Sequence, residues 1–345
     1  MPVAVVTGGT AGVGRATARL LADHGWDVAV LARGAERLDA TRTDLEARGA
    51  HVLALEVDVA DAGAVEDAAA RVEDELGPVD VWINNAMATV YAPTWELDPH
   101  EFARATQVTY LGVVHGTLAA LRRMRPRNRG TIVQVGSALS YRGIPLQSPY
   151  CGAKHAVKGF TESLRTELMH ERSRVHVTMV HLPALNTPQF EWGRTKLRRH
   201  PQPVPPIFQP EVAAEAIVFA ATHRRRELLV AWPTVKTVWG NKLAPWLADL
   251  YLARAGFDAQ QTDEPVDPNR PDNLDAPAPG DWAAHGSFDA QAKRSSALLR
   301  ASLHRDALAT AAGAALVVLG LRRRSTVTRP RARRRSAGAA ARPPR

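Results

Sequence analysis

The sequence predicts an α/β fold: a doubly wound parallel sheet of seven strands, with helices on both faces and an irregular C-terminal extension. Short valine-rich runs alternate with segments of helical period over the first two thirds of the chain. Such runs are typical of strands buried on both faces, and their alternation with helices favours parallel pairing through right-handed crossovers. The expected strands are residues 3–7, 27–32, 51–57, 80–84, 130–135, 174–180 and 227–232.

Three regions are expected along the 345 residues. Residues 1–235 carry the alternation and form the expected main domain. Residues 236–300 combine one amphipathic helix, interrupted by a proline, with a segment rich in Pro and Asp that we expect to lie as a loop on the surface. Residues 301–345 hold an uncharged stretch, 307–321, which we expect to be an apolar helix, followed by an arginine-rich tail that we expect to be disordered.

The net charge of +9 is concentrated in that tail. Residues 322–345 hold ten arginines and no acid, which leaves 34 basic and 35 acidic side chains for the rest of the chain. A nearly neutral body gives no electrostatic reason to expect a nucleic-acid partner. The single cysteine, Cys151, allows no intramolecular disulfide, and no signal peptide is visible. We therefore expect a cytoplasmic protein.

A glycine-rich turn follows the first expected strand and opens a helix, in the sequence TGGTAGVGRATA. A pyrophosphate needs this arrangement, because the backbone must approach it closely and a helix N-terminus supplies free N–H groups. A tight turn without a ligand would use the same glycines, but the strand before and the helix after favour dinucleotide binding. The expected cofactor contacts are Gly8, Thr10, Gly12, Val13 and Gly14.

The second expected strand ends at Ala32 and Arg33, where NAD-binding folds usually have an acid for the ribose 2′-hydroxyl. Arginine at this point suits a 2′-phosphate, and Arg15 follows the last glycine of the turn. We therefore expect NADP as the cofactor, with Arg15 and Arg33 as contacts and NAD as the alternative. A solvated surface charge is the other interpretation of Arg33.

Four segments together resemble the short-chain dehydrogenase/reductase family: TGGTAGVG, NNAM, Ser137 and YCGAK. The resemblance covers residues 1–232 in the family's order and spacing. It implies a Rossmann-fold oxidoreductase that acts on a small-molecule carbonyl or secondary alcohol, with Ser137, Tyr150 and Lys154 as the catalytic centre. It also implies that Tyr150 and Lys154 contact the cofactor, together with Asp58, Val59, Asn84, Ala86, Pro183 and Thr187.

The Tyr–Lys pair has a physical rationale. On a helix, Tyr150 and Lys154 lie on one face with Cβ atoms roughly 5–6 Å apart. A free tyrosine has a pKa of about 10, too high for efficient proton exchange near neutrality. A nearby ammonium favours the phenolate and lowers that pKa. We expect Tyr150 to act as general acid and base, with Ser137 donating a hydrogen bond to the same substrate oxygen.

Three positions depart from the family pattern. Met87 replaces the usual glycine after NNA, and Ala184 replaces another glycine after the sixth strand. Thr109 stands where the family often has a catalytic asparagine that binds a proton-relay water. We keep Thr109 among the expected catalytic residues, because its hydroxyl can also bind water.

The remaining expectations concern the lid, metals and assembly. The family places its substrate lid over residues 186–210, where Phe190, Trp192, Ile207 and Phe208 would either line an apolar pocket or pack in the interior. The histidines show no ligand spacing, so we expect no metal. We expect a homo-oligomer. The rival interpretations are a catalytically weak nucleotide-binding protein and a protein attached to the membrane through peripheral contact of residues 307–321 and the arginine tail.

Overall fold

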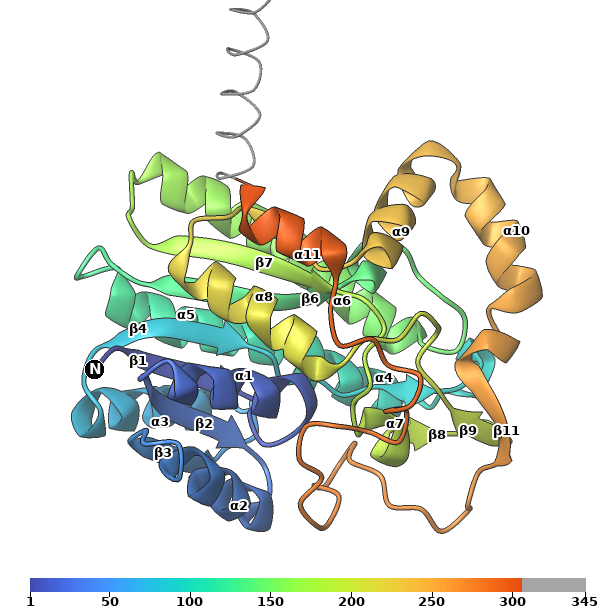
Figure 1. The fold of residues 1–345 in the computed structure, drawn as a ribbon, viewed down its shortest axis with the longest axis horizontal. Helices are drawn as coiled ribbons and strands as arrows, with labels where there is room; N and C mark the ends of the chain where they lie inside the picture. The colour runs from blue at the N-terminus through green and yellow to red at the C-terminus, as the bar shows by residue number, and fades with distance from the viewer. Residues whose placement is uncertain (306–345) are drawn as a thin grey trace, which may run out of the picture. The chain divides into compact units, whose positions relative to one another are not determined.

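The computed structural model describes residues 1–305, and residues 1–300 form one compact unit. Its centre is the predicted parallel sheet of seven strands, in the order β10-β7-β6-β4-β1-β2-β3 (Figure 1). All seven predicted strands are confirmed. Their bounds are β1 Val3–Thr7, β2 Asp27–Ala32, β3 Val52–Glu56, β4 Val79–Asn84, β6 Thr131–Ser137, β7 His176–Leu182 and β10 Glu227–Leu229.

Helices cover both faces of this sheet, as the pattern predicts. On one face α1 packs against α2 and α8, and on the other α3 packs against α5 while α6 packs against α4 and β7 (Figure 1). The bounds are α1 Gly12–Asp23, α2 Ala35–Glu46, α3 Ala62–Glu75, α4 Pro99–Thr106, α5 Gly112–Met124, α6 Ser148–His170 and α8 Pro210–Thr222, with a π-helical turn Gln107–Leu111 joining α4 to α5.

The strand order reverses between β1 and β4. From β1 the chain builds outward through β2 and β3, and from β4 it builds the other way through β6, β7 and β10. Loops that leave neighbouring strands on opposite sides open a crevice at their carboxyl ends. The fold therefore prepares a binding site beyond Thr7 and Asn84, the last residues of β1 and β4.

Smaller elements surround the carboxyl edge of the sheet. Two short pairs form there, β5 with β8 and β9 with β11. The described part of the chain also contains three single-turn 3₁₀ segments. The bounds are β5 Val90–Tyr91, α7 Gln189–Trp192, β8 Arg194–Thr195, β9 Arg199–Pro201 and β11 Gln261–Pro265, and the 3₁₀ segments are Thr94–Glu96, Ala138–Ser140 and Asp258–Gln260.

The helix predicted over residues 239–256 is two helices, α9 Trp232–Leu243 and α10 Pro245–Ala255. The break falls at Ala244, whose φ of −147° and ψ of 66° lie outside the helical region. The cause is Pro245, because proline has no N–H to donate and its ring disfavours a helical conformation in the residue before it. The two helices pack against each other as a hairpin.

After β11 the chain crosses the carboxyl edge of the sheet in an extended path that we call the strap, residues 266–293. Its backbone bonds to remote segments: Asn273 N donates to Trp192 O (3.1 Å) and Lys293 N to Ile207 O (2.9 Å). The strap is thus held to the rest of the unit by backbone hydrogen bonds. A last helix, α11 Ala297–Leu303, follows it.

The predicted apolar helix 307–321 and the arginine tail lie outside the described residues. Among residues 1–305, no helix has the length and apolar character needed to cross a bilayer.

Candidate active site

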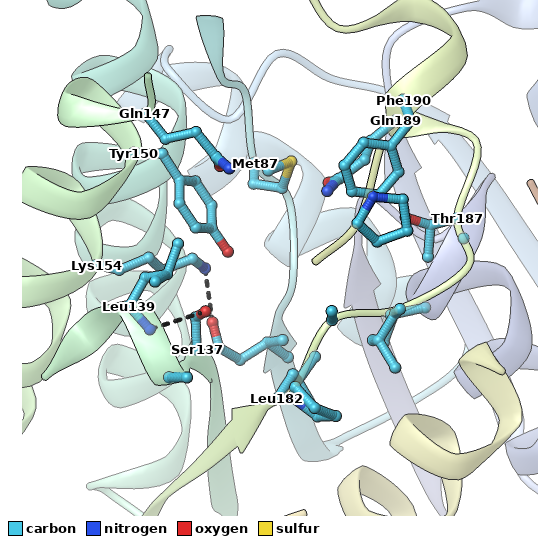
Figure 2. Close-up of a pocket in the computed structure, with 18 of the residues that line it drawn as sticks. Met87, Ser137, Leu139, Gln147, Tyr150, Lys154, Leu182, Thr187, Gln189 and Phe190 are labelled. Carbon is cyan, nitrogen blue, oxygen red and sulfur yellow. Dashed lines mark hydrogen bonds between the residues drawn. The ribbon is translucent and has the colours of Figure 1, made fainter. Parts of the chain in front are cut away.

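A cavity of about 590 Å³ lies where the fold predicts, at the carboxyl ends of β1, β4 and β6. Its walls come from the glycine-rich turn after β1, the start of α6, the segment after β7, the α9–α10 hairpin and the strap. Figure 2 shows Ser137, Tyr150 and Lys154 on one wall, facing Thr187, Gln189 and Phe190 across the cavity.

The glycine-rich turn has the geometry of a phosphate cradle. Gly8 and Gly12 have φ of +65° and +54°, a region that side chains with a Cβ rarely adopt. A Cβ on Gly14 would lie 2.1 Å from Gly8 O, so α1 can approach the turn only with glycine there. Asn85 Nδ2 donates to Thr7 O (3.0 Å) and Gly8 O (3.1 Å) and fixes the turn against the end of β4. The residues present fit a dinucleotide pyrophosphate.

The two predicted phosphate-binding arginines lie in different places. Arg33 lines the cavity, with Arg37 one turn further along. Arg15 does not line it: its side chain is 2% exposed, and Nε bonds Asp44 (2.9 Å) while NH1 bonds Thr41 Oγ1 (2.7 Å). Two arginines on α1 hold Asp44, and the resulting hydrogen bonds lower the pKa of that carboxyl to about 2, against its burial. Arg15 therefore joins α1 to α2.

Arg33 is oriented by the strap. Its NH1 donates to Leu274 O (3.2 Å) and Asp275 O (3.1 Å), and its NH2 to Asn273 O. Burial lowers the pKa of Arg33 from its ordinary value, and Asp58 raises it. Arg37 lies over the Trp192 ring, 5.0 Å from the centroid. The two guanidinium groups thus meet at one end of the cavity, which we call the arginine end.

Asp58 and Val59 line the cavity. Asp58 accepts from Ala60 N (3.0 Å) and Arg104, and these bonds lower its pKa despite its partial burial. The side chains at the end of β4 and just after it point in different directions. Ala86 lines the cavity, whereas Asn84 is buried among Trp82, Thr117 and Gln134 and does not. Its neighbour Asn85 lines the cavity instead, because successive strand residues point in opposite directions.

The predicted catalytic residues Ser137, Tyr150 and Lys154 all line the cavity. Ser137 ends β6, and Tyr150 lies in the first turn of α6, whose start is favoured by Pro149. In Figure 2 the Tyr150 hydroxyl points into the cavity above Ser137. Ser137 Oγ accepts from Leu139 N (3.1 Å), a bond that fixes the hydroxyl and leaves its proton for donation. We call this the catalytic end.

Lys154 is 2% exposed, and its Nζ donates to Val135 O (2.7 Å). Burial lowers the pKa of this ammonium to about 8. Nζ lies 5.5 Å from the centre of the Tyr150 ring. Burial raises the pKa of Tyr150 above its usual value and the Ser137 hydroxyl lowers it. The net direction is opposite to the expectation from the lysine, because loss of hydration disfavours the phenolate more than the neighbours favour it.

Thr109 is fully buried in the π-helical turn and does not line the cavity. Its Oγ1 donates to Ala88 O (2.8 Å) and accepts from Ala88 N (2.9 Å). The hydroxyl has one proton, which it donates in the hydrogen bond to Ala88 O. The side chain therefore joins α4–α5 to the loop after β4. Its predicted catalytic role stays a prediction.

Most of the other predicted cofactor contacts line the same cavity. Gly8, Thr10, Gly12, Val13, Pro183 and Thr187 line the cavity, and Gly14 lies behind the turn. All four lid side chains are buried, at 5% exposed for Phe190, 6% for Trp192, 2% for Ile207 and 5% for Phe208. Of the four, Phe190 and Trp192 also line the cavity.

Sequence reasoning missed three contributions to the cavity. Arg37 has a signal that could have been used, since it follows Arg33 by one helical turn. The strap residues Asn273 and Pro277 and the hairpin residues Tyr251 and Leu252 also line the cavity. They lie 100 residues or more from the glycine-rich turn, and no local pattern connects them to it.

Comparison with known proteins decides the family. A profile described as short chain dehydrogenase matches residues 2–196. An oxidoreductase of Bacillus subtilis named YxnA, described as uncharacterized, is 31% identical over 77% of this chain and 75% of its own. The chain belongs to the short-chain dehydrogenase family. It is an oxidoreductase acting on CH–OH groups, and its family uses NAD(P).

Two further relatives describe the range of this family. A fatty acyl-CoA reductase of Acinetobacter baylyi is 27% identical over 66% of this chain and 75% of its own. The solved structure of an alcohol dehydrogenase from the archaeon Thermococcus sibiricus, complexed with 5-hydroxy-NADP, matches with a TM-score of 0.57. It is 28% identical, and the match covers 66% of this chain and 95% of the other.

Proposed function

We propose that this short-chain dehydrogenase is an NADP(H)-dependent oxidoreductase that interconverts a carbonyl and a secondary alcohol, with Tyr150 as general acid and base. One observation carries the proposal. Ser137, Tyr150 and Lys154 meet at one end of a cavity whose other end holds the glycine-rich turn and two arginines. A donor, a proton source and a buried cation at one wall suit a carbonyl oxygen that gains negative charge.

In the reducing direction, Tyr150 transfers its hydroxyl proton to the carbonyl oxygen and Ser137 donates a hydrogen bond to that oxygen. When bound, the nicotinamide supplies the hydride for the carbonyl carbon, or accepts it in reverse. One hydride and one proton convert the carbonyl to the alcohol. Burial raises the pKa of Tyr150, so its proton is present at neutral pH. Lys154, held by Val135 O, would bind the nicotinamide ribose and balance the phenolate that forms.

The arginine end supports NADP as the cofactor. Arg33 and Arg37 line the cavity after β2, where an acid would otherwise bind a ribose 2′-hydroxyl. A guanidinium offers several donors in a fixed plane and matches a phosphate well. Burial lowers the pKa of Arg33 and Asp58 raises it, and a guanidinium stays charged in proteins. Ala32, the last residue of β2, has no group for the hydroxyl.

The substrate we propose is a carbonyl compound with an apolar chain. The cavity is lined by apolar side chains that include Leu139, Ile144, Phe190, Val204 and Leu252, with polar ones such as Arg142, Gln147 and Gln202 among them. One relative is named for a fatty acyl substrate. A methylene in such a wall contributes about 1–3 kcal/mol to discrimination, so a longer chain gains specificity steadily.

The test is a panel of ketones and aldehydes of rising chain length, with steroids, sugars and acyl thioesters beside them, assayed with NADPH and with NADH. We expect kcat/KM to rise with apolar chain length and to be higher with NADPH. Binding of NADPH without turnover of any carbonyl would support the nucleotide-binding alternative. Preference for sugars would contradict the apolar substrate while leaving the catalytic assignment intact.

A further inference from the structure

The α9–α10 hairpin has an apolar surface that faces away from the protein. Seven side chains on the two helices are 49–79% exposed, although all are large and apolar or aromatic: Trp232, Trp239, Leu243, Trp246, Leu247, Leu250 and Tyr251. No residue of α10 is buried. Figure 1 shows the hairpin standing out from the edge of the sheet, beside α6 and β11. Exposed apolar surface gathered in this way marks an interaction site.

The two faces of α10 have different neighbours. Ala248, Leu252 and Ala255 line the cavity and are half-buried. Outside the cavity wall, α10 carries Trp246, Leu247 and Leu250, and Leu243 is the last residue of α9. The apolar faces of a helix need apolar surroundings. The body of the protein supplies them on one side only.

The charge on this outward surface is positive. Lys242 and Arg254 belong to the hairpin outside the cavity wall, and in residues 1–305 no carboxylate forms an ion pair with either of them. Lys242 lies over the Trp239 ring, 5.3 Å from its centroid. The hairpin's one acid, Asp249, is paired with Arg142. The uncompensated charges of the surface are therefore all cations.

We propose that the α9–α10 hairpin binds the surface of a membrane that contains anionic phospholipid. Trp and Tyr are favoured at the depth of the lipid headgroups, and Lys and Arg beside them attract anionic lipid. The helices lie in the interface and do not cross it, because 12 and 11 residues give lengths of only about 18 and 17 Å against a hydrocarbon core of about 30 Å.

A second copy of the chain fits this surface less well than lipid does. In a symmetric dimer each patch meets its own copy, so Lys242 and Arg254 would face the same cations. The core of a protein–protein interface is depleted in charge, and like charges across it are unfavourable. A lipid surface takes the opposite sign and leaves the tryptophans half hydrated, as their exposure allows.

The test measures binding of the full chain to vesicles of pure phosphatidylcholine and of phosphatidylcholine with about 30% phosphatidylglycerol, by co-sedimentation. The variant carries Leu243→Glu, Trp246→Glu and Leu250→Glu. The matched control carries Trp95→Glu and Met169→Glu, which are 80% and 70% exposed and lie on other parts of the surface. All chains keep residues 306–345, so any binding by that segment is common to them.

We expect the hairpin variant to bind anionic vesicles at least about tenfold more weakly, and the control to stay within about twofold of the original protein. Salt at about 0.5 M should weaken binding of the original protein, since the charge contribution is screened. Equal binding by the original protein and the hairpin variant would overturn the proposal.

Two further measurements keep the result decisive. Hydrogen exchange on the unaltered protein should slow in residues 232–255 when anionic vesicles are added, a readout that needs no variant to fold. Light scattering gives the oligomeric state of each chain. If vesicles leave the exchange of residues 232–255 unchanged and the hairpin variant converts a dimer to a monomer, the surface binds a second copy and the membrane proposal is wrong.

Discussion

The two ends of the cavity are built from different ranges of the chain. At the catalytic end, Ser137, Tyr150 and Lys154 come from one strand and the helix that follows it, within 18 residues. At the arginine end, Arg33 is held by backbone carbonyls of the strap, 240 residues away. The first is a local motif on rigid elements, and the second depends on a long-range contact. The catalytic end should therefore tolerate changes in the extension that alter the arginine end.

The largest effect should come from the catalytic end. Tyr150→Phe removes the proton donor and keeps the ring, so we expect kcat to fall at least about a hundredfold, the low end of general-acid contributions. The dissociation constant for NADPH should stay within about threefold, because the arginine end is untouched. Steady-state kinetics and a fluorescence titration measure the two quantities.

Tyr110→Phe is the matched control for this variant and should keep kcat. Turnover of Tyr150→Phe close to that of the original enzyme would remove Tyr150 from the mechanism.

The second effect concerns Lys154, buried with a pKa of about 8 against 10.5 for a free lysine. Below pH 8 the side chain is charged in both the folded and the unfolded state, and the folded state carries the cost of burial. Between pH 8 and 10.5 the unfolded chain holds more protons, so stability rises with pH. The difference of about 2.5 pH units corresponds to about 3 kcal/mol.

Lys154→Met removes this titration. We expect the free energy of unfolding of the original protein, minus that of the variant, to rise by about 2–3 kcal/mol from pH 7 to pH 10 in urea titrations without cofactor. If this difference in the free energy of unfolding stays constant over the range, burial does not disfavour the charged form of Lys154 in the folded protein.

The third effect concerns the anchorage of the strap. Asn186 is fully buried: its Nδ2 donates to Gln209 (3.1 Å) and Asp289 (2.8 Å), and its Oδ1 accepts from Phe288 N (3.0 Å). Asn186→Ala should lower the free energy of unfolding by about 2 kcal/mol, because buried partners lose their hydrogen bonds. Thermal or urea unfolding measures it.

Asn269→Ala, an exposed change on the same strap, should shift stability by less than about 0.5 kcal/mol. Equal losses in the two variants would show that Asn186 does not anchor the strap.

The smallest effect tests the arginine end itself. Arg33→Asp should weaken NADPH binding about tenfold, or about 1.4 kcal/mol, and leave NADH binding equal or stronger. Its control is Arg42→Asp, the same change in charge on the outer side of α2, which should leave both affinities unchanged. A preference of the original protein for NADH would refute the interpretation of Arg33.

The sequence predicts the parts that local chemistry determines. Valine-rich runs predicted every strand of the sheet, because burial on both faces leaves few other residue types. Ser137, Tyr150 and Lys154 were predicted from the resemblance to the family, and the structure brings them to one cavity because a strand end and one helical turn position them. Their catalytic roles stay predictions. Arg15 was predicted to bind phosphate because no local pattern pairs it with Asp44, which lies 29 residues further along. In the structure the Arg15 guanidinium bonds to Asp44 in the interior. Asn84 was predicted as a cofactor contact but points into the interior, because the direction of a strand's last side chain depends on where its pairing stops.

The strap and the hairpin could not be predicted as walls of the cavity. Their residues follow no short-range period, and their contacts depend on how a chain of more than 200 residues folds back. Pro245 indicates that the helix is interrupted, but it does not indicate in which direction the second helix runs.

The strap also determines how many residues a shortened chain must keep for the cavity to stay intact. The profile match ends at residue 196, yet Gly12 N of the glycine-rich turn donates to Ala283 O (3.0 Å) and Trp282 lies edge-on to Trp192 (5.4 Å between centroids). A chain shortened to the matched segment would expose these groups to water and lose the carbonyls that orient Arg33. The portable unit for chimeras, fusions and directed evolution therefore extends to about residue 300, the end of the compact unit.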